Sequence, residues 1–283
     1  MQTLKPSDIT IVDLGVDDVA EAHRLSQQEA WPHRLEDWQF LLAISQGVGA
    51  LCDGKLVGTA VLTPYGVTAA TCNMIIVDPA MRGLGLGRRL VERLLERAGD
   101  RECRLIATQA GLPLYEKLGF VANGDIRQYQ GVVKPAAMSA DITDATLADL
   151  PELIALDTAA QGLDRGALMR QLIKEEPFLL LRDQDGLRGF SSCRPFGRGF
   201  ILGPLVARDD EAFKALLGAS IARHEGQFLR VDLTDAASSA ASLVEAAGLS
   251  QVGGGVAMTR PGSETIKPSG NARVYALASQ ALC

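Results

Sequence analysis

Apolar and polar positions change their spacing between Met74 and Leu95, and the change predicts a strand, a loop and a helix. Met74 to Val77 is a continuous apolar run with β-branched residues, bounded by Asp78 and Pro79, which is typical of a buried strand. Further along, apolar residues recur at helical spacing with charged residues between them, which predicts an amphipathic helix. Its apolar face is Leu90, Val91, Leu94 and Leu95, and its polar face is Arg88, Arg89, Glu92, Arg93 and Glu96.

Three glycines, Gly83, Gly85 and Gly87, lie between the predicted strand and the predicted helix. A helix that begins directly after such a loop presents unpaired N–H groups and the positive end of its dipole, and glycines let the backbone approach a ligand closely. The stretch therefore predicts a site for phosphate or pyrophosphate. The alternative is an ordinary glycine-rich turn between a strand and a helix, and the flanking sequence must decide. It is not the dinucleotide fingerprint G-x-G-x-x-G, because Arg88 or Leu90 stands at the third glycine position, and no Gly-Lys-Ser/Thr of a P-loop follows.

The pattern of the first 133 residues predicts strands and helices around this loop, with turn signals at 53–55 and 64–66. The expected order is strand 9–14, helices 17–30 and 35–44, strands 49–52, 56–62 and 67–77, the glycine loop with its helix, strand 103–108, helix 112–118, and two last strands within 120–133.

The motif Arg82-x-x-Gly85-x-Gly87 resembles the R/Q-x-x-G-x-G/A signature of the GNAT superfamily of N-acetyltransferases. A second stretch, residues 107–120, ends in Leu-Tyr-Glu-Lys-Leu-Gly-Phe and looks like the second motif of that family, in the expected order. The resemblance covers about residues 7–133 and is weak for the half that would bind an acceptor. It implies the family's α/β (α+β) fold, a mixed central sheet flanked by helices, and acetyl-coenzyme A as the cofactor.

In this family the amides of the glycine loop hold the pyrophosphate of acetyl-coenzyme A. The strand before the loop splays from its neighbour and leaves amides free for the cofactor, one of which is expected to donate to the oxyanion. The resemblance implies the following cofactor-binding residues in this chain: Ile75, Ile76, Val77, Arg82, Gly83, Leu84, Gly85, Leu86, Gly87 and Arg88.

Tyr115 and His33 are the candidate catalytic residues. By the resemblance, the tyrosine of the second motif sits near the thioester sulfur, and a phenol with a pKa near 10 keeps its proton at pH 7 and can act as general acid. The alternative is that Tyr115 only packs its helix on the sheet. His33 lies between the two early helices, a segment that lines the acceptor site in related enzymes, and is a candidate general base. Alternatively it caps a helix while its neighbours Trp31 and Trp38 pack a core.

The second half of the chain repeats turn signals of the first half in the same order, which indicates an internal duplication rather than two unrelated hairpins. We therefore expect tandem domains, residues 1–135 with an intact cofactor motif and residues 141–283 without it, joined by a linker at 134–140. The second copy has Ala-Arg-Asp-Asp-Glu after Val206, and these acids would repel a pyrophosphate. The matching signals are Asp53-Gly54, Gly58 and Pro64-Tyr65-Gly66 in one copy, and Asp185-Gly186, Gly189 and Pro195-Phe196-Gly197 in the other.

Composition narrows the classes of protein that fit. The chain has 283 residues, a net charge of −6 and a pI of about 5.2, so general binding to nucleic acid or to anionic membranes is not expected. Its five cysteines are scattered without a C-x-x-C pair, so neither a metal site nor a disulfide framework is expected. The chain has no apolar signal core near its start and no run of about 18 apolar residues, which favours a cytoplasmic protein.

The leading interpretation is an N-acetyltransferase that moves the acetyl group of acetyl-coenzyme A to a primary amine of a small-molecule acceptor by direct attack. Two alternatives keep the fold: an acyltransferase that uses a longer acyl-coenzyme A, and a non-catalytic, acyl-coenzyme A-binding regulatory protein. Tyr115 favours catalysis, because a sensor would not need an acid beside the sulfur.

Overall fold

A computed structural model describes residues 9–135 and 142–283 of the chain. The first half folds in the order that the hydrophobic pattern predicts as far as residue 120. Its elements are β1 (Ile9–Leu14), α1 (Val19–Gln28), α2 (Leu35–Leu42), β2 (Gln46–Cys52), β3 (Lys55–Tyr65), β4 (Ala69–Val77), α3 (Leu86–Ala98), β5 (Glu102–Ala107), α4 (Leu112–Lys117) and β6 (Val121–Val132).

The second half repeats this order of elements. In both copies a long strand ends in an aromatic residue, Tyr65 or Phe196, and a glycine with positive φ follows, Gly66 at 62° or Gly197 at 55°. The predicted linker falls mostly on residues 136–141, which lie outside the described residues, so the boundary between the domains stays a prediction. The elements are β7 (Ile142–Asp144), α5 (Leu150–Gln161), α6 (Gly166–Glu175), β8 (Leu179–Asp183), β9 (Gly186–Phe196), β10 (Gly199–Ala207), α7 (Asp210–Ala222), β11 (Phe228–Leu233), α8 (Ala241–Ala246), β12 (Ser250–Arg260) and β13 (Arg273–Ala276).

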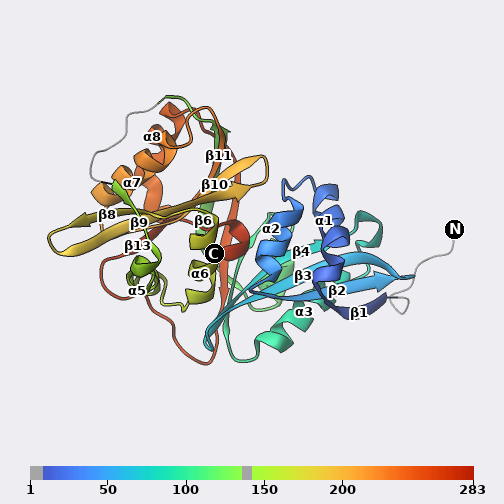
Figure 1. Ribbon diagram of the computed structural model, residues 1–283. Coiled ribbons are helices and arrows are strands. Elements are labelled where there is room, and N and C mark those ends of the chain that lie inside the picture. The colour runs from blue at the N-terminus through green and yellow to red at the C-terminus, as the bar shows by residue number, and fades with distance from the viewer. Residues whose placement is uncertain (1–8, 136–141) are drawn as a thin grey trace.

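One mixed sheet runs through both halves of the chain (Figure 1). Within the described residues its strand order is β1-β2-β3-β4-β5-β12-β6-β11-β13-β10-β9-β8-β7. The order is nearly symmetric about its middle, since β1 to β5 on one side correspond to β7 to β11 on the other. The predicted fold class, a mixed sheet flanked by helices, is confirmed. The exception to the symmetry is β13, which lies between β10 and β11.

The two halves exchange a strand at the middle of the sheet. β12, from the second half, pairs with β5 on one side and with β6 on the other. β6 in turn pairs with β11 of the second half. The prediction of two strands within 120–133 is wrong, because this segment is the single strand β6. Gly124 has no positive φ that would form a tight turn there, and strands of the second half pair with β6 on both sides, so tertiary pairing overrides the local turn signal.

The glycines of β12 allow this exchange because they let three backbones lie very close together. A Cβ atom at Gly254 would lie 1.8 Å from the carbonyl oxygen of Ile126 in β6, and Gly254 has a φ of 155° that favours glycine. A Cβ atom at Gly255 would lie 2.5 Å from the side chain of Ile106 in β5. The run Gly253-Gly254-Gly255 is therefore part of a central strand rather than a loop.

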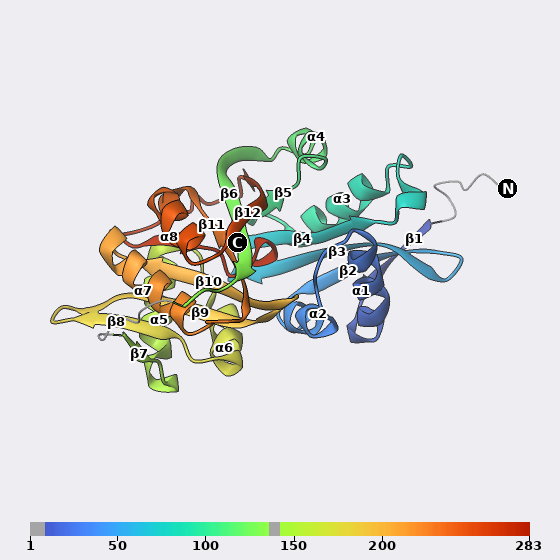
Figure 2. The same cartoon turned by 90° about the horizontal axis from the view of Figure 1, so that it is seen from above.

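Helices cover both faces of the sheet (Figure 2). α3 and α4 pack on one face of the first half, over the buried sides of β3 to β5. α1 and α2 pack on the opposite face, and their core continues into that of α5 and α6 in the second half. Trp38 is fully buried in this shared core, where its indole N–H donates to Ser26 Oγ at 3.1 Å. None of the helices in the described residues is long and apolar enough to span a membrane.

Candidate active site

The glycine loop turns the chain from β4 into α3 and leaves the start of the helix open. Gly83 and Gly85 have φ values of 79° and 74°, in the left-handed region that glycine adopts without strain. A Cβ atom at either position would meet no heavy atom within 4 Å, so the loop faces open space. Gly85 caps α3, whose first-turn N–H groups have no partners inside the helix. The open loop and these N–H groups form a cradle that suits an anion.

The side chains of the loop contribute differently from its backbone. Leu86 is 1% exposed and packs into the core under α3, so only its backbone can face a ligand. The Arg82 guanidinium forms an ion pair with Glu29 at the end of α1. Arg88 donates to Glu92, with 2.7 Å between Nε and Oε1, on the exposed face of α3. Both arginines are therefore paired at the surface, and their contact with a phosphate stays a prediction.

β4 and β5 separate beside the glycine loop. They pair in parallel only from Ala69 to Thr71, opposite Glu102 to Arg104. Beyond this point β4 contains a bulge, where Met74 has a φ of 45° and the register with β3 shifts. Ile75, Ile76 and Val77 follow the bulge, and the edge of β4 that faces β5 has no strand partner there among the described residues. The backbone predicted to contact the cofactor thus lies along an open edge.

A cavity of about 340 Å³ lies where these two strands separate. β4 and β5 supply one wall, and the segment between α1 and α2 supplies a second wall with His33. β6 adds Gln128. The second half supplies the other lining residues: Phe196 of β9, Arg230 of β11, Gly253 and Gly254 of β12, and the segment from Ser279 to Ala281. Both copies of the duplicated fold therefore build this cavity.

His33 is half-buried in the cavity wall, with its Nδ1 atom fully buried. Burial lowers its pKa to about 4, and the neighbouring Arg230 and Arg194 lower it as well, whereas Asp37 raises it. Its ring lies 5.8 Å from Trp31 and 5.2 Å from Phe196, and its Nδ1 has no hydrogen-bond partner among the described residues. The structure thus places His33 in the wall of this cavity, and its role as a general base stays a prediction.

Asn73 of β4 is a site residue that the sequence reading missed. Its Nδ2 donates to Thr63 Oγ1 at 3.0 Å, but its Oδ1 is buried without a partner among the described residues. A buried amide oxygen without a donor is costly and often marks a place where a ligand binds. In the sequence, the signal for Asn73 is a single amide side chain within an apolar strand.

Tyr115 lies on the other face of the sheet from His33, in the core beside α3. The residue is 8% exposed, its ring packs 5.9 Å from Phe120, and its hydroxyl makes no hydrogen bond within the described residues. Burial raises the pKa of Tyr115 to about 12, and the thiol of Cys72 adds to the rise. Cys72 also lines the cavity. Tyr115 therefore packs its helix, as the alternative reading held, and also keeps a protonated, unpartnered hydroxyl.

In the second copy the opening that corresponds to the one between β4 and β5 is filled. β10 and β11 pair in parallel only at Phe200–Leu202, and beyond this point β13 pairs with both strands. Tyr275 of β13 stacks on Phe213 of α7 with ring centres 4.2 Å apart, and its hydroxyl donates to Asp210 Oδ1 at 2.8 Å. The start of α7, which carries the predicted acids, is thus occupied by the chain itself.

We therefore expect one coenzyme A to bind per chain. The second copy lacks the glycine loop, places acids at the start of its helix and holds β13 in the opening, and each feature opposes a pyrophosphate. Calorimetric titration of the protein with coenzyme A measures the stoichiometry. Two equivalent sites per chain would contradict this prediction.

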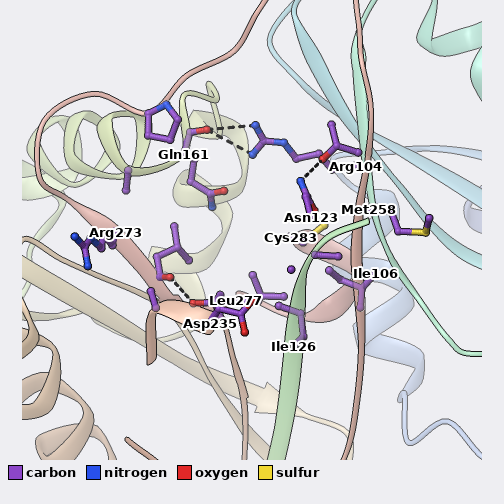
Figure 3. A pocket seen from close by; sticks show the side chains of 18 of the residues that line it. Arg104, Ile106, Asn123, Ile126, Gln161, Asp235, Met258, Arg273, Leu277 and Cys283 are labelled. Atoms are coloured by element: carbon purple, nitrogen blue, oxygen red, sulfur yellow. Dashed lines mark hydrogen bonds between the residues drawn. The ribbon is translucent and has the colours of Figure 1, made fainter. Parts of the chain in front are cut away.

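A second cavity, of about 530 Å³, lies over β5, β12 and β6 (Figure 3). In it Arg104 reaches the backbone carbonyl of Gln161, and Asn123 donates to Thr259 Oγ1 at 2.8 Å. Ile106 lines both cavities. None of the residues predicted as catalytic or cofactor-binding lines this second cavity, so we place the candidate site in the first one.

Comparisons with known proteins agree with this geometry. The family model "Acetyltransferase (GNAT) family" matches residues 16–120, and the model "Acetyltransferase (GNAT) domain" matches residues 153–276. The uncharacterized N-acetyltransferase YitH of Bacillus subtilis is 30% identical over 234 residues, which cover 79% of this chain and 81% of that protein. The N-alpha-acetyltransferase RimI of Mycobacterium tuberculosis is 32% identical over 140 residues, 44% of this chain and 89% of that protein.

Solved structures share the fold over the whole chain. A protein of Pyrococcus horikoshii superimposes with a TM-score of 0.82 and 19% identity, covering 100% of this chain and 99% of its own. A tandem GNAT protein from the clavulanic acid biosynthesis pathway superimposes with a TM-score of 0.63 and 14% identity, covering 91% of this chain and 99% of its own. At these identities the likeness concerns the fold alone.

Proposed function

This chain belongs to the GNAT family of acetyltransferases, and we propose that it transfers the acetyl group of acetyl-coenzyme A to a primary amine of a small acceptor. The proposal rests on three neighbouring features of the structure. They are the open glycine loop at the start of α3, the unpaired edge of β4, and the cavity beside that edge. These features follow one another along the chain, because Cys72 to Met74 line the cavity, Ile75 to Val77 form the unpaired edge, and the glycine loop comes next.

The residues of these three features fit acetyl-coenzyme A. The backbone from Arg82 to Arg88 would hold its pyrophosphate, because the loop is open at Gly83 and Gly85 and leads into the N-terminus of α3. The edge from Ile75 to Val77 would hold its pantetheine arm by backbone hydrogen bonds and would offer an N–H group to the oxyanion. The bound cofactor supplies an acetyl thioester.

Residues of the cavity can prepare the acceptor for attack. An amine must be neutral to attack a carbonyl carbon, and its nitrogen must lose a proton as the C–N bond forms. The Asn73 Oδ1 atom can accept an N–H of the amine and so orient the nitrogen lone pair toward β4. His33 is neutral, so it can take the proton directly or through a water molecule.

Tyr115 can act on the leaving group. As the C–S bond breaks, negative charge collects on the sulfur, and a protonated phenol can hydrogen-bond it and pass it a proton. The hydroxyl of Tyr115 keeps its proton far above neutral pH and has no partner in the described residues that would hold it away from a sulfur.

Purified protein incubated with acetyl-coenzyme A and a panel of small primary amines tests the proposal. We expect thiol release that depends on the amine, with the acetylated amine identified by mass spectrometry. A parallel panel of longer acyl-coenzyme A donors should give slower release. Coenzyme A binding without amine-dependent thiol release across the panel would contradict the proposed transfer.

Tyr115→Phe should lower kcat by on the order of 10²-fold, while the Kd of coenzyme A stays near that of the wild type. The substitution removes only the hydroxyl, which makes no hydrogen bond in the described residues, so the packing on Phe120 should persist. Steady-state kinetics and calorimetry measure the two quantities. Full activity in the variant would show that Tyr115 only packs its helix on the sheet.

The pH dependence should show no ionisation of His33 near neutral pH. Because its pKa is lowered to about 4, His33 is already unprotonated at pH 5 and above, and a role as base would be lost only as the pH falls through about 4. We therefore expect kcat/KM for acetyl-coenzyme A, measured with saturating acceptor, to lack a limb at pH 6–7. A limb in that range that disappears in His33→Gln would refute the neutral histidine.

A further inference from the structure

The cavity between the two copies has an unusual charge pattern for a site that takes an amine. Among the described residues that line it, Arg230 is the one that carries a charge at neutral pH, because the imidazole of His33 is neutral and none of these residues is an aspartate or a glutamate. A second cationic group on an acceptor would find no carboxylate there. The lining therefore disfavours diamines and polyamines and leaves one cation unmatched by the walls of the cavity.

Arg230 is held in a fixed orientation from behind. Its Nε and Nη2 atoms donate to the Asp232 carboxylate, with Nη2 2.8 Å from Oδ2, and Asp232 is fully buried. Gln280 Nε2 also donates to Asp232, at 3.1 Å from Oδ1. The guanidinium carbon lies 5.5 Å from the ring centre of Phe196. The Nη1 group remains without a hydrogen-bond partner among the described residues.

A second arginine, Arg194, lies behind Phe196. Arg194 is buried, lies 5.0 Å from the ring centre of Phe196, and donates to Asp37 Oδ1 at 3.2 Å. Asp37 is also the partner of Arg34, at 2.9 Å. Two guanidinium groups thus share one carboxylate, and the pair of Arg230 with Asp232 adds no net charge. Glu175 acts electrostatically on both Arg194 and Arg34, and the Arg34 side chain is 34% exposed, so the charges behind Phe196 are largely offset. Arg230 is therefore the group that can attract an anion into the cavity.

We propose that the acceptor is a small amine that also bears a carboxylate, with the carboxylate on Nη1 of Arg230 and the amine at Asn73. The proposal rests on the proposed transfer function. A charge-assisted hydrogen bond to a preorganised guanidinium favours a carboxylate. A volume of about 340 Å³ suits a ligand of the size of an amino acid.

Matched pairs of acceptors test the proposal on the wild-type protein. Each amino acid of a panel of α- and ω-amino acids is compared with the amine that remains when its carboxylate is removed, for example alanine with ethylamine. Phosphonate analogues of the same amino acids test whether another anion serves. We expect kcat/KM to favour the carboxylate member by about 10- to 100-fold. Equal or faster turnover of the amines without a carboxylate would overturn the proposal but leave the transfer function intact. Faster turnover of the phosphonates would show that the acceptor carries a different anion, and would also overturn it.

A double variant locates the preference. Arg230→Gln with Asp232→Asn removes both charges of the buried pair together, so neither charge is left uncompensated. We expect the ratio of kcat/KM between the amino acid and its matched amine to fall toward 1, while the Kd of coenzyme A stays unchanged. The matched control is Arg93→Gln with Glu96→Gln, an exposed pair on α3, in which the preference should persist. A preference unchanged in the double variant would exclude Arg230 as its source.

Binding of products gives a readout that does not depend on turnover. Calorimetry with coenzyme A present compares N-acetylalanine, and the other N-acetylated members of the panel, with uncharged counterparts such as N-ethylacetamide. We expect the wild type to bind the carboxylates about 10- to 100-fold more tightly, and the folded double variant to bind both classes alike. No carboxylate preference in the wild type, or no binding of any member, would overturn the proposal even if no acceptor in the panel is turned over.

Discussion

Gly85→Glu should abolish the binding of coenzyme A. The new side chain would project from the loop into the open space where the pyrophosphate is expected, and its carboxylate would repel the phosphates by about 1 kcal/mol for each charge pair at 4 Å in water, and by about 4 kcal/mol near a protein surface. The positive φ of Gly85 adds a backbone cost of roughly 1–2 kcal/mol for a residue with a Cβ atom. A rise of Kd by about 10²-fold or more is expected, measured by calorimetry.

Two further variants separate the effect of charge repulsion from that of backbone strain. Gly85→Ala carries the backbone cost without the charge and should bind more tightly than Gly85→Glu. Gly226→Glu is the matched control, because Gly226 also has a positive φ, 75°, and an open space around a Cβ atom, but lies in the second copy. Its affinity for coenzyme A should equal that of the wild type. If the folded Gly85→Glu variant binds normally, the loop is not the pyrophosphate site.

The strand, loop and helix that form the candidate cofactor site could be predicted from the sequence because their signals are local. The alternation of apolar runs, glycines and helical spacing between Met74 and Leu95 lies in one continuous stretch, and local patterns of this kind fix a strand, a loop and a helix. The structure places β4, the glycine loop and α3 there. The duplication was readable for the same reason, since the turn residues recur in the same order.

The middle of the sheet could not be read because its pairings are not local. The segment from Ser250 to Arg260 contains three consecutive glycines, which on propensity favour a turn. It becomes a central strand because Gly254 and Gly255 allow the backbones of β5 and β6 to approach. β13 is likewise stable only because β10 and β11 separate to receive it. Such partners lie more than 40 residues away in the sequence, and no periodicity within the strand encodes them.

The part of the candidate site that would bind the acceptor could not be predicted either, because the strand exchange between the two halves builds it. Arg230 and Asp232 alternate with apolar residues in β11, a pattern that in isolation predicts a solvent-exposed face. Both are buried because the first copy and the segment around Gln280 cover that face. The prediction of His33 rests on the resemblance to the acetyltransferases and stays a prediction, since a histidine close to two tryptophans carries no local signal for a ligand.

The segment that follows β13 is anchored by a buried ion pair, in which each charge depends on the other for compensation. Arg165 is fully buried, and its Nη2 and Nε atoms donate to Asp157 at 2.6 and 2.9 Å. Its Nη1 donates to the backbone carbonyl of Leu282 at 3.2 Å. The residues just before Leu282 line the acceptor cavity. The ion pair therefore couples the packing of α5 and α6 to the wall of the candidate site.

Asp157→Ala should lower the free energy of unfolding by about 3–5 kcal/mol, because it leaves the charge of Arg165 buried without a partner. Replacing both residues together, Asp157→Leu with Arg165→Met, should cost far less, since no charge is then left uncompensated. The control is Glu96→Ala, which breaks the exposed pair with Arg93 and should change stability by about 0.5 kcal/mol or less. Urea unfolding followed by circular dichroism measures all three. A single variant as stable as the control would show that Arg165 finds other partners when Asp157 is lost, and that the wall of the cavity does not depend on this pair.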